Sequence, residues 1–155
     1  MKQSPTEDEL ASLLEALVNR VSHPRGRALA FLAKASLTVD QAILLHHAFN
    51  EPGSTPTRLG QRMNLSLPSV SQMIKRLEQA GMLRRVEDLA DRRRKSILVT
   101  SKAKTFLARF RSVRIAEFAA ATEGLSPAAR HELATAIRAA LDELGEDHDH
   151  QGSQP

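Results

Sequence analysis

Residues 57–100 constrain the fold of this 155-residue chain more than any other stretch. They contain two segments with helical apolar spacing, followed by two short segments of strand-like composition. These segments are 57–63, 67–80, 83–87 and 96–100. Asn64 and Gly81 follow the two helical segments, and both residue types accept the left-handed conformation that ends a helix. The stretch therefore predicts two helices joined by a tight turn, and then a β-hairpin.

The second of these helices has one apolar side and one polar side. Val70, Ile74 and Leu77 recur at the spacing of one helical face, so we expect them to be buried. The opposite arc includes Gln72 and Arg76, whose side chains can bond to base edges and phosphates. An ordinary amphipathic helix with a solvated polar face is the alternative.

Three consecutive arginines, Arg92, Arg93 and Arg94, lie in the expected hairpin loop, directly after Asp91. A tight hairpin turn would favour a pair such as Asn-Gly instead. Asp91 is placed to bind one guanidinium, and the others can enter a narrow, electronegative minor groove. A solvated charged loop is the alternative. The helix pair and the hairpin together predict a mainly α fold with a small β-hairpin wing. This arrangement is a winged helix-turn-helix, which holds one helix in the major groove of DNA.

The net charge of +4 is unevenly distributed. Residues 55–104 contain twelve Lys and Arg against four acids, a net charge of +8, and the rest of the chain is net acidic. Such a basic segment favours double-stranded DNA as a partner, because phosphate neutralisation releases counterions. With no cysteine, the chain has no disulfide, cysteine-zinc site or thiol sensor. It also lacks an apolar run of about 18 residues and a signal peptide, so we expect a cytoplasmic protein with no membrane partner.

Apolar stripes at 10–21 and 133–144 flank the expected DNA-reading unit. A winged helix-turn-helix does not need them for its own core, so we expect them to be buried against a second copy of the chain. Folding back onto the same subunit is the alternative. Pro24 and Gly26 predict a break in the first helical region. We expect the polar segment 145–155 to be a disordered tail.

The chain resembles the MarR family of bacterial transcription regulators over about residues 8–144. The residues that carry the resemblance are Leu37–Gln41, Leu59-Gly60, Asn64–Ser66, Leu77–Leu83, and the spacing of Asp91, Arg93 and Thr100. The resemblance implies one domain over 1–144, with helices at 7–35 and 101–144 for dimerisation and a DNA-binding lobe at 38–100. It also implies a homodimer whose two winged lobes straddle one palindromic site.

The resemblance also assigns roles to individual residues. It implies that Asp91 and Arg93 brace the wing and that Arg92 or Arg94 enters the minor groove. The expected contacts of the recognition helix with DNA are Ser66, Pro68, Ser69, Ser71, Gln72 and Arg76.

The family often binds small, anionic aromatic molecules, so the resemblance implies an effector such as an aromatic carboxylate or a phenol. The candidate residues for this effector are His23, Arg25, Arg27, His46 and His47. Ordinary core or interface histidines, and arginines in a solvated turn, are the alternatives. We expect no metal and no cofactor, because no histidine or carboxylate pair has ligand spacing in a folded segment.

The function expected from these observations is a homodimeric repressor of a pseudo-palindromic operator, released by a small ligand. Two alternatives stay open: a regulator without small-molecule input, and a non-specific architectural DNA-binding protein. We expect no enzymatic activity, because the sequence has no nucleophile–base motif, phosphate loop or metal cluster.

Overall fold

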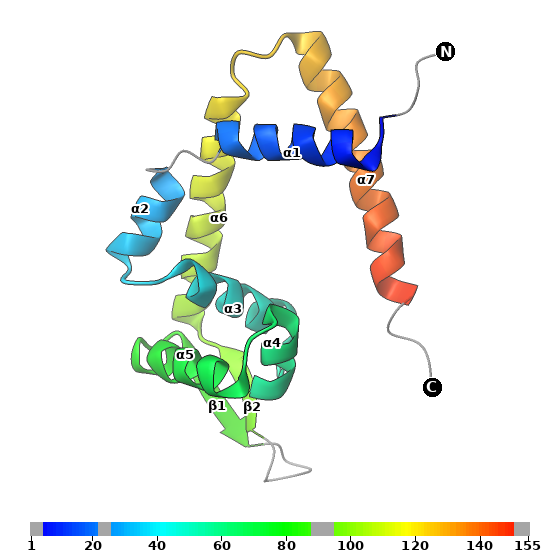
Figure 1. Ribbon diagram of the computed structural model, residues 1–155. Helices are drawn as coiled ribbons and strands as arrows, with labels where there is room; N and C mark the ends of the chain where they lie inside the picture. The colour runs from blue at the N-terminus through cyan, green and yellow to red at the C-terminus, as the bar shows by residue number, and fades with distance from the viewer. Residues whose placement is uncertain (1–4, 22–25, 88–94, 151–155) are drawn as a thin grey trace. The chain divides into compact units, whose positions relative to one another are not determined.

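The computed structural model describes residues 5–21, 26–87 and 95–150, and it is mainly helical with one β-hairpin (Figure 1). The elements are α1 (Glu7–Val21), α2 (Arg27–Lys34), α3 (Val39–Asn50), α4 (Pro56–Met63), α5 (Leu67–Gln79), β1 (Leu83–Glu87), β2 (Lys95–Val99), α6 (Ser101–Ala121) and α7 (Pro127–His150). This order confirms the predicted fold class. The expected bounds agree with the structure to within a residue or two, except at the end of α7.

Polar side chains set the start of several helices. The Thr6 hydroxyl accepts the Glu9 amide at 3.2 Å before α1. Thr38 and Gln41 form a capping box at the start of α3, in which each side chain accepts the backbone N–H of the other residue. Such caps satisfy amides that have no partner within the helix. α1 and α2 are separate helices, as the predicted break requires, and Pro24 lies outside the described residues.

A single apolar core joins α3, α4, α5 and the hairpin into a lobe (Figure 1). Its fully buried large side chains are Leu44, Leu45, Leu59, Val70, Ile74, Leu77 and Ile97. Phe106 of α6 is also buried, and its ring lies 5.3 Å from that of Phe31 in α2. The three residues predicted to form the inner face of α5 are therefore all in the core.

The hairpin is fixed to this lobe at its base. β1 and β2 pair antiparallel, with Leu83 opposite Val99. Ser54, in the loop before α4, forms an isolated β-bridge with Ile97, and the Ile97 amide donates to the Ser54 carbonyl at 2.9 Å. The buried Ile97 thus ties the loop and the hairpin together, so the direction of the hairpin is set by the core.

α1 and α7 are among the described helices that carry exposed apolar side chains in this single chain. On α1 these are Leu10, Leu13, Leu14, Leu17 and Val18. On α7, which belongs to a second compact unit beginning at residue 118, they are Ile137, Leu141 and Leu144. Both sets have helical spacing, so each helix presents an apolar stripe.

α7 continues as a helix beyond Leu144 to His150. The start of the polar segment, which we expected to be part of a disordered tail, is therefore helical. Its Glu, Asp and His residues are compatible with a helix, and the one glycine, Gly145, costs only about 1 kcal/mol relative to alanine. Residues 151–155 lie outside the described part of the chain.

Within the described ranges, no single helix is long and apolar enough to cross a membrane. α2 and α3 meet the length and composition criteria only as a pair, and they are bent by 87° relative to each other. Much of α3 lies in the core of the lobe, including Leu44 and Leu45.

Candidate nucleic-acid interface

α4 and α5 are joined by a turn that needs two special residues. Asn64 ends α4 in the left-handed conformation, with φ 51° and ψ 42°. The Leu65 amide then donates to the Gly60 carbonyl at 2.9 Å. A Cβ atom on Gly60 would lie only 3.1 Å from the Leu65 carbonyl oxygen, so a glycine permits this close approach. The result is a compact helix-turn-helix in which α5 is the second helix.

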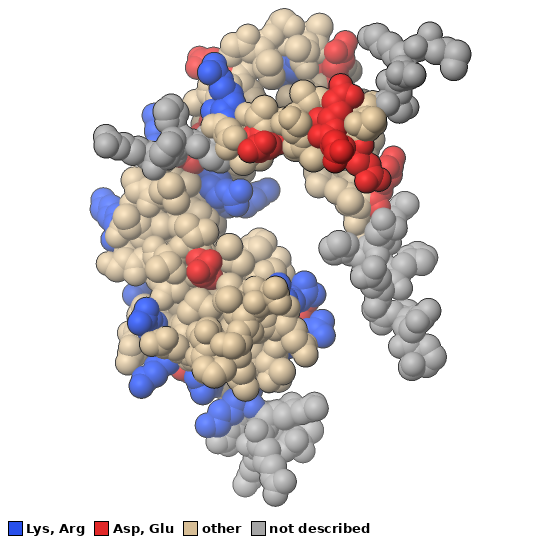
Figure 2. Space-filling view, in the orientation of Figure 1, with Lys and Arg blue, Asp and Glu red and all other residues tan. Residues whose placement is uncertain are grey.

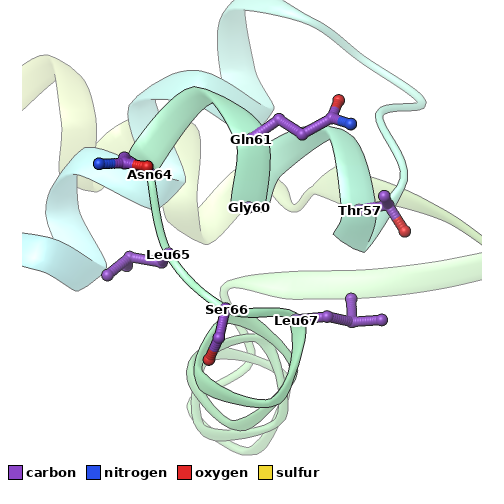
Figure 3. Close-up of a pocket in the computed structure, with 7 residues that line it drawn as sticks. All are labelled: Thr57, Gly60, Gln61, Asn64, Leu65, Ser66 and Leu67. Atoms are coloured by element: carbon purple, nitrogen blue, oxygen red, sulfur yellow. The ribbon is translucent and has the colours of Figure 1, made fainter.

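The start of α5 is exposed and rich in hydrogen-bonding groups. Ser66 caps the helix, and its hydroxyl lies 2.8 Å from that of Ser69. An open pocket of about 390 Å³ separates this first turn from α4. Figure 3 shows its lining residues: Thr57, Gly60, Gln61, Asn64, Leu65, Ser66 and Leu67. Because the first amides of a helix attract anions, this end of α5 suits contact with a phosphate.

The exposed side of α5 carries the residues that we expected at DNA. Ser66, Pro68, Ser69, Gln72 and Arg76 are exposed, and Ser71 is partly buried. The opposite side is fully buried through Val70, Ile74 and Leu77. The helix is therefore held by its apolar side, while its polar side faces solvent along its whole length.

The end of α5 is fixed by its own backbone and by α6. Gly81 has φ +70°, and the amides of Gly81 and Met82 bond to the Glu78 and Leu77 carbonyls, which is a Schellman motif. The Thr100 hydroxyl donates to the Gly81 carbonyl at 2.8 Å, and the Lys102 ammonium donates to the Ala80 carbonyl at 2.7 Å. Thr100 belongs to the wing spacing identified in the sequence. The role of Lys102 could not be predicted, because its contact with Ala80 joins segments that are distant in the chain.

The wing begins directly after this motif. Arg85 of β1 pairs with Glu78 of α5 at 3.2 Å, which adds a link between the hairpin and the helix. The four residues that we expected at the tip, Asp91, Arg92, Arg93 and Arg94, lie outside the described residues.

Basic side chains lie along the edge of the lobe in the view of Figure 2. Exposed lysines and arginines there include Arg58, Arg62, Lys75, Arg76, Arg84 and Lys95. The surface potential of this region is therefore suited to a polyanion such as DNA.

Comparison with known proteins agrees with this geometry. The family model described as "MarR family" matches residues 35–94, which run from the residue after α2 to the residue before β2. This segment, which contains the helix-turn-helix and β1, is similar to the MarR family. A curated relative, the HTH-type transcriptional regulator TtmR of Methylorubrum extorquens, is 34% identical over 107 residues, or 67% of this chain. The chain spans about half of that relative, 55% of its length.

Solved MarR-family structures share the fold. A MarR family protein from Bacillus stearothermophilus has a TM-score of 0.72 at 20% identity, and the match covers 94% of this chain and 99% of that one. A mutant MepR of S. aureus, solved bound to an oligodeoxyribonucleotide, has a TM-score of 0.63 at 20% identity, with coverage of 91% and 99%. At this identity the structures establish the winged fold alone. TtmR is described as an HTH-type transcriptional regulator.

Of the expected effector residues, the structure describes Arg27, His46 and His47, and none of them lines the pocket at the start of α5. His46 and His47 lie on α3, with ring centres 6.4 Å apart, and the exposed His46 accepts from the Asn50 amide at 3.1 Å. Arg27 is exposed at the start of α2. His23 and Arg25 lie outside the described residues.

A different part of the lobe contains an open groove of about 610 Å³. Its lining residues are Phe31, Ala35, Ala80, Met82, Ser101, Lys102, Thr105, Phe106 and Arg109. None of the expected effector residues is among them. The groove combines aromatic rings with two cations, and one of those cations, Lys102, also caps the end of α5.

His47 is partly buried on α3, and its protonation is coupled to folding. Burial lowers its pKa below the usual 6.5, and the nearby positive charges of Arg62 and His46 lower this pKa further. The neutral ring therefore contributes stability that is fully present above pH 6.5 and is lost as pH falls through the lower folded pKa.

A His47→Gln variant is accordingly expected to lose less stability than the original protein between about pH 7 and about pH 5. Urea midpoints followed by circular dichroism at both pH values measure this difference. Substitution of the exposed His131 of α7 by Gln is the matched control, and it should leave the pH dependence unchanged. Identical pH dependence in the His47 variant and the original protein would contradict the assignment.

Proposed function

We propose that the protein is a sequence-specific DNA-binding transcription regulator that inserts α5 into the major groove. The observation that carries the proposal is the fixation of α5, whose apolar side is buried and whose two ends are capped while its polar side stays exposed. A helix held in this way can place side chains against base edges with little loss of conformational entropy. The proposal rests on the geometry of α5 within its lobe. The similarity of residues 35–94 to the MarR family supports it.

The proposed contacts follow from this orientation. The residues at the start and along the exposed side of α5 would contact bases and phosphates: Ser66, Pro68, Ser69, Ser71, Gln72 and Arg76. In the wing, we propose that Asp91 binds Arg93 and that Arg92 or Arg94 enters the minor groove. A protein that acts on chromosomal DNA in this way would work in the cytoplasm.

We propose that the protein acts as a homodimer, with 38–100 as the DNA-binding lobe and the terminal helices within 7–35 and 101–144 as the dimer interface. The exposed apolar stripes of α1 and α7 support this, since large exposed apolar surfaces usually mark interaction sites. Two-fold symmetry would then require a pseudo-palindromic site with half-sites about 10 base pairs apart.

We further propose that the protein is a repressor that a small anionic aromatic molecule releases from DNA. The groove between α2 and the start of α6 supports such a ligand, because Phe31 and Phe106 offer stacking surfaces and Arg109 offers a cation. The ligand would act by binding one form of the protein more tightly than the other. Operator binding that persists across a wide panel of aromatic acids would instead indicate a regulator without this input.

Substitution of Arg76 by Ala tests base reading by α5. The loss of a base contact is expected to cost about 1–3 kcal/mol of binding free energy and to relax the preference at one position of the site. Fluorescence anisotropy with a selected duplex and its single-base variants measures both effects. Arg111→Ala, the same change on α6, is the control. Equal losses on every sequence would show that Arg76 contacts only phosphate.

A further inference from the structure

Glu51, the residue that follows α3, pairs with two arginines, Arg58 and Arg62. Both arginines lie on α4, the first helix of the helix-turn-helix. The Glu51 carboxylate oxygen Oε2 accepts from Arg58 Nε at 2.7 Å, and Oε1 accepts from Arg62 Nη2. The two arginines are four residues apart on α4, so their side chains are neighbours on the helix surface. One carboxylate thus contacts two guanidinium groups, and the cluster keeps a net positive charge.

The carboxylate is held by a rigid part of the lobe. Glu51 ends α3, and its carbonyl accepts from the Ser54 hydroxyl at 2.8 Å. The same loop pairs with the wing, because the Gly53 amide donates to the Ile97 carbonyl at 3.2 Å and the Ile97 amide donates to Ser54. Ser54 and Ile97 are both buried. Glu51 therefore holds the arginines from a fixed position on the core.

Both guanidinium groups retain donors that face solvent. The side chains of Arg58 and Arg62 are 61% and 44% exposed. Arg58 uses Nε for the carboxylate, which leaves its two Nη groups, and Arg62 uses Nη2, which leaves Nε and Nη1. An arginine held along one edge presents the other edge to a second acceptor at a reduced entropic cost.

The arginines of α4 directly follow residues that line the pocket at the start of α5. Thr57 and Gln61, the residues that precede them, line the pocket at the start of α5 (Figure 3). Arg58 and Arg62 each follow one of these lining residues directly, so they lie next to them on α4. In helix-turn-helix proteins the first helix crosses the sugar–phosphate backbone while the second enters the groove.

We propose that Arg58 and Arg62 form a phosphate-binding pair that contacts the DNA backbone next to the recognition helix. The pair adds sequence-independent affinity, because phosphate oxygens carry no base information. This inference rests on the proposed DNA-binding function and extends it to two residues of α4 that the sequence analysis did not select.

The test is the salt dependence of DNA binding by the full chain with Arg58→Gln and Arg62→Gln together. Each phosphate contact contributes about 0.9 to the slope of log affinity against log salt. The double variant should therefore have a slope smaller by about 1.8, on a random-sequence duplex and on a selected duplex alike. Arg111→Gln with Arg138→Gln removes the same charge from α6 and α7 and should leave the slope near its original value, with sedimentation velocity used to confirm that the oligomeric state of this control is unchanged. Circular dichroism melts check that every variant is folded.

Glu51→Gln separates two roles for the carboxylate. If the arginines contact phosphate while Glu51 holds them, this variant keeps the slope of the original protein. A steeper slope for Glu51→Gln would show that Glu51 withholds the arginines from DNA. An unchanged slope for the double arginine variant would show that the arginines bind only Glu51. Either result overturns the proposal. If the original protein shows no preference for any selected duplex, sequence-specific regulation fails, yet the slopes on random DNA still test the pair.

Discussion

Substitution of Leu10 and Leu14 by Glu is expected to convert the proposed dimer to a monomer and to abolish the proposed operator binding. Both side chains lie in the exposed apolar stripe of α1, and two charges there would have to be desolvated in a dimer interface. A monomer contacts only one half-site, so its affinity should approach the non-specific level, a loss of about 1,000-fold or more. Sedimentation velocity and anisotropy measure the two effects.

The control for this variant is Ser12→Glu. Ser12 is exposed on the same helix, about half a turn away from the apolar stripe, so its substitution adds charge without entering the proposed interface. This control should remain dimeric and bind the operator normally. A doubly substituted protein that is still dimeric would show that the stripe of α1 is not the interface.

Ile74→Ala is expected to destabilise the DNA-binding lobe by about 2–5 kcal/mol. Ile74 is fully buried between α5 and the rest of the core, so its truncation leaves a cavity beneath the recognition helix. Because natural domains have only about 5–15 kcal/mol of stability, this is a large fraction of the total. Urea unfolding followed by circular dichroism measures it, since the chain has neither Trp nor Tyr for fluorescence.

Two variants calibrate this result. Ile74→Val keeps most of the side chain and should cost only about 0.5–1.5 kcal/mol. Gln72→Ala changes the exposed side of the same helix and should leave stability nearly unchanged. All proteins must be compared at one concentration, because the proposed dimer formation would add to apparent stability. Equal midpoints for the Ala and Val variants would contradict the role of Ile74 in the core.

The local features of the fold could be predicted from the sequence because short-range patterns determine them. The spacing of Val70, Ile74 and Leu77 identified the buried side of α5. Asn64 and Gly81 marked the ends of the two helices, and both have the positive φ that this role requires. These predictions depend on helical periodicity and on backbone sterics, which operate within a few residues.

Long-range contacts could not be predicted in the same way. The Lys102 contact with Ala80 and the Glu51 contacts with Arg58 and Arg62 depend on how the helices pack. No spacing rule in a single sequence encodes such packing. The groove lined by Phe31 and Arg109 was missed for the same reason, whereas His46 and His47 were selected only for their chemistry.

The most direct test of the account is selection of DNA sites from a random pool by the purified 155-residue chain. At about 0.15 M salt, where non-specific binding is weak, the selected DNA should contain a pseudo-palindrome with half-sites about 10 base pairs apart. Binding that enriches no common sequence would contradict the proposal that α5 reads bases.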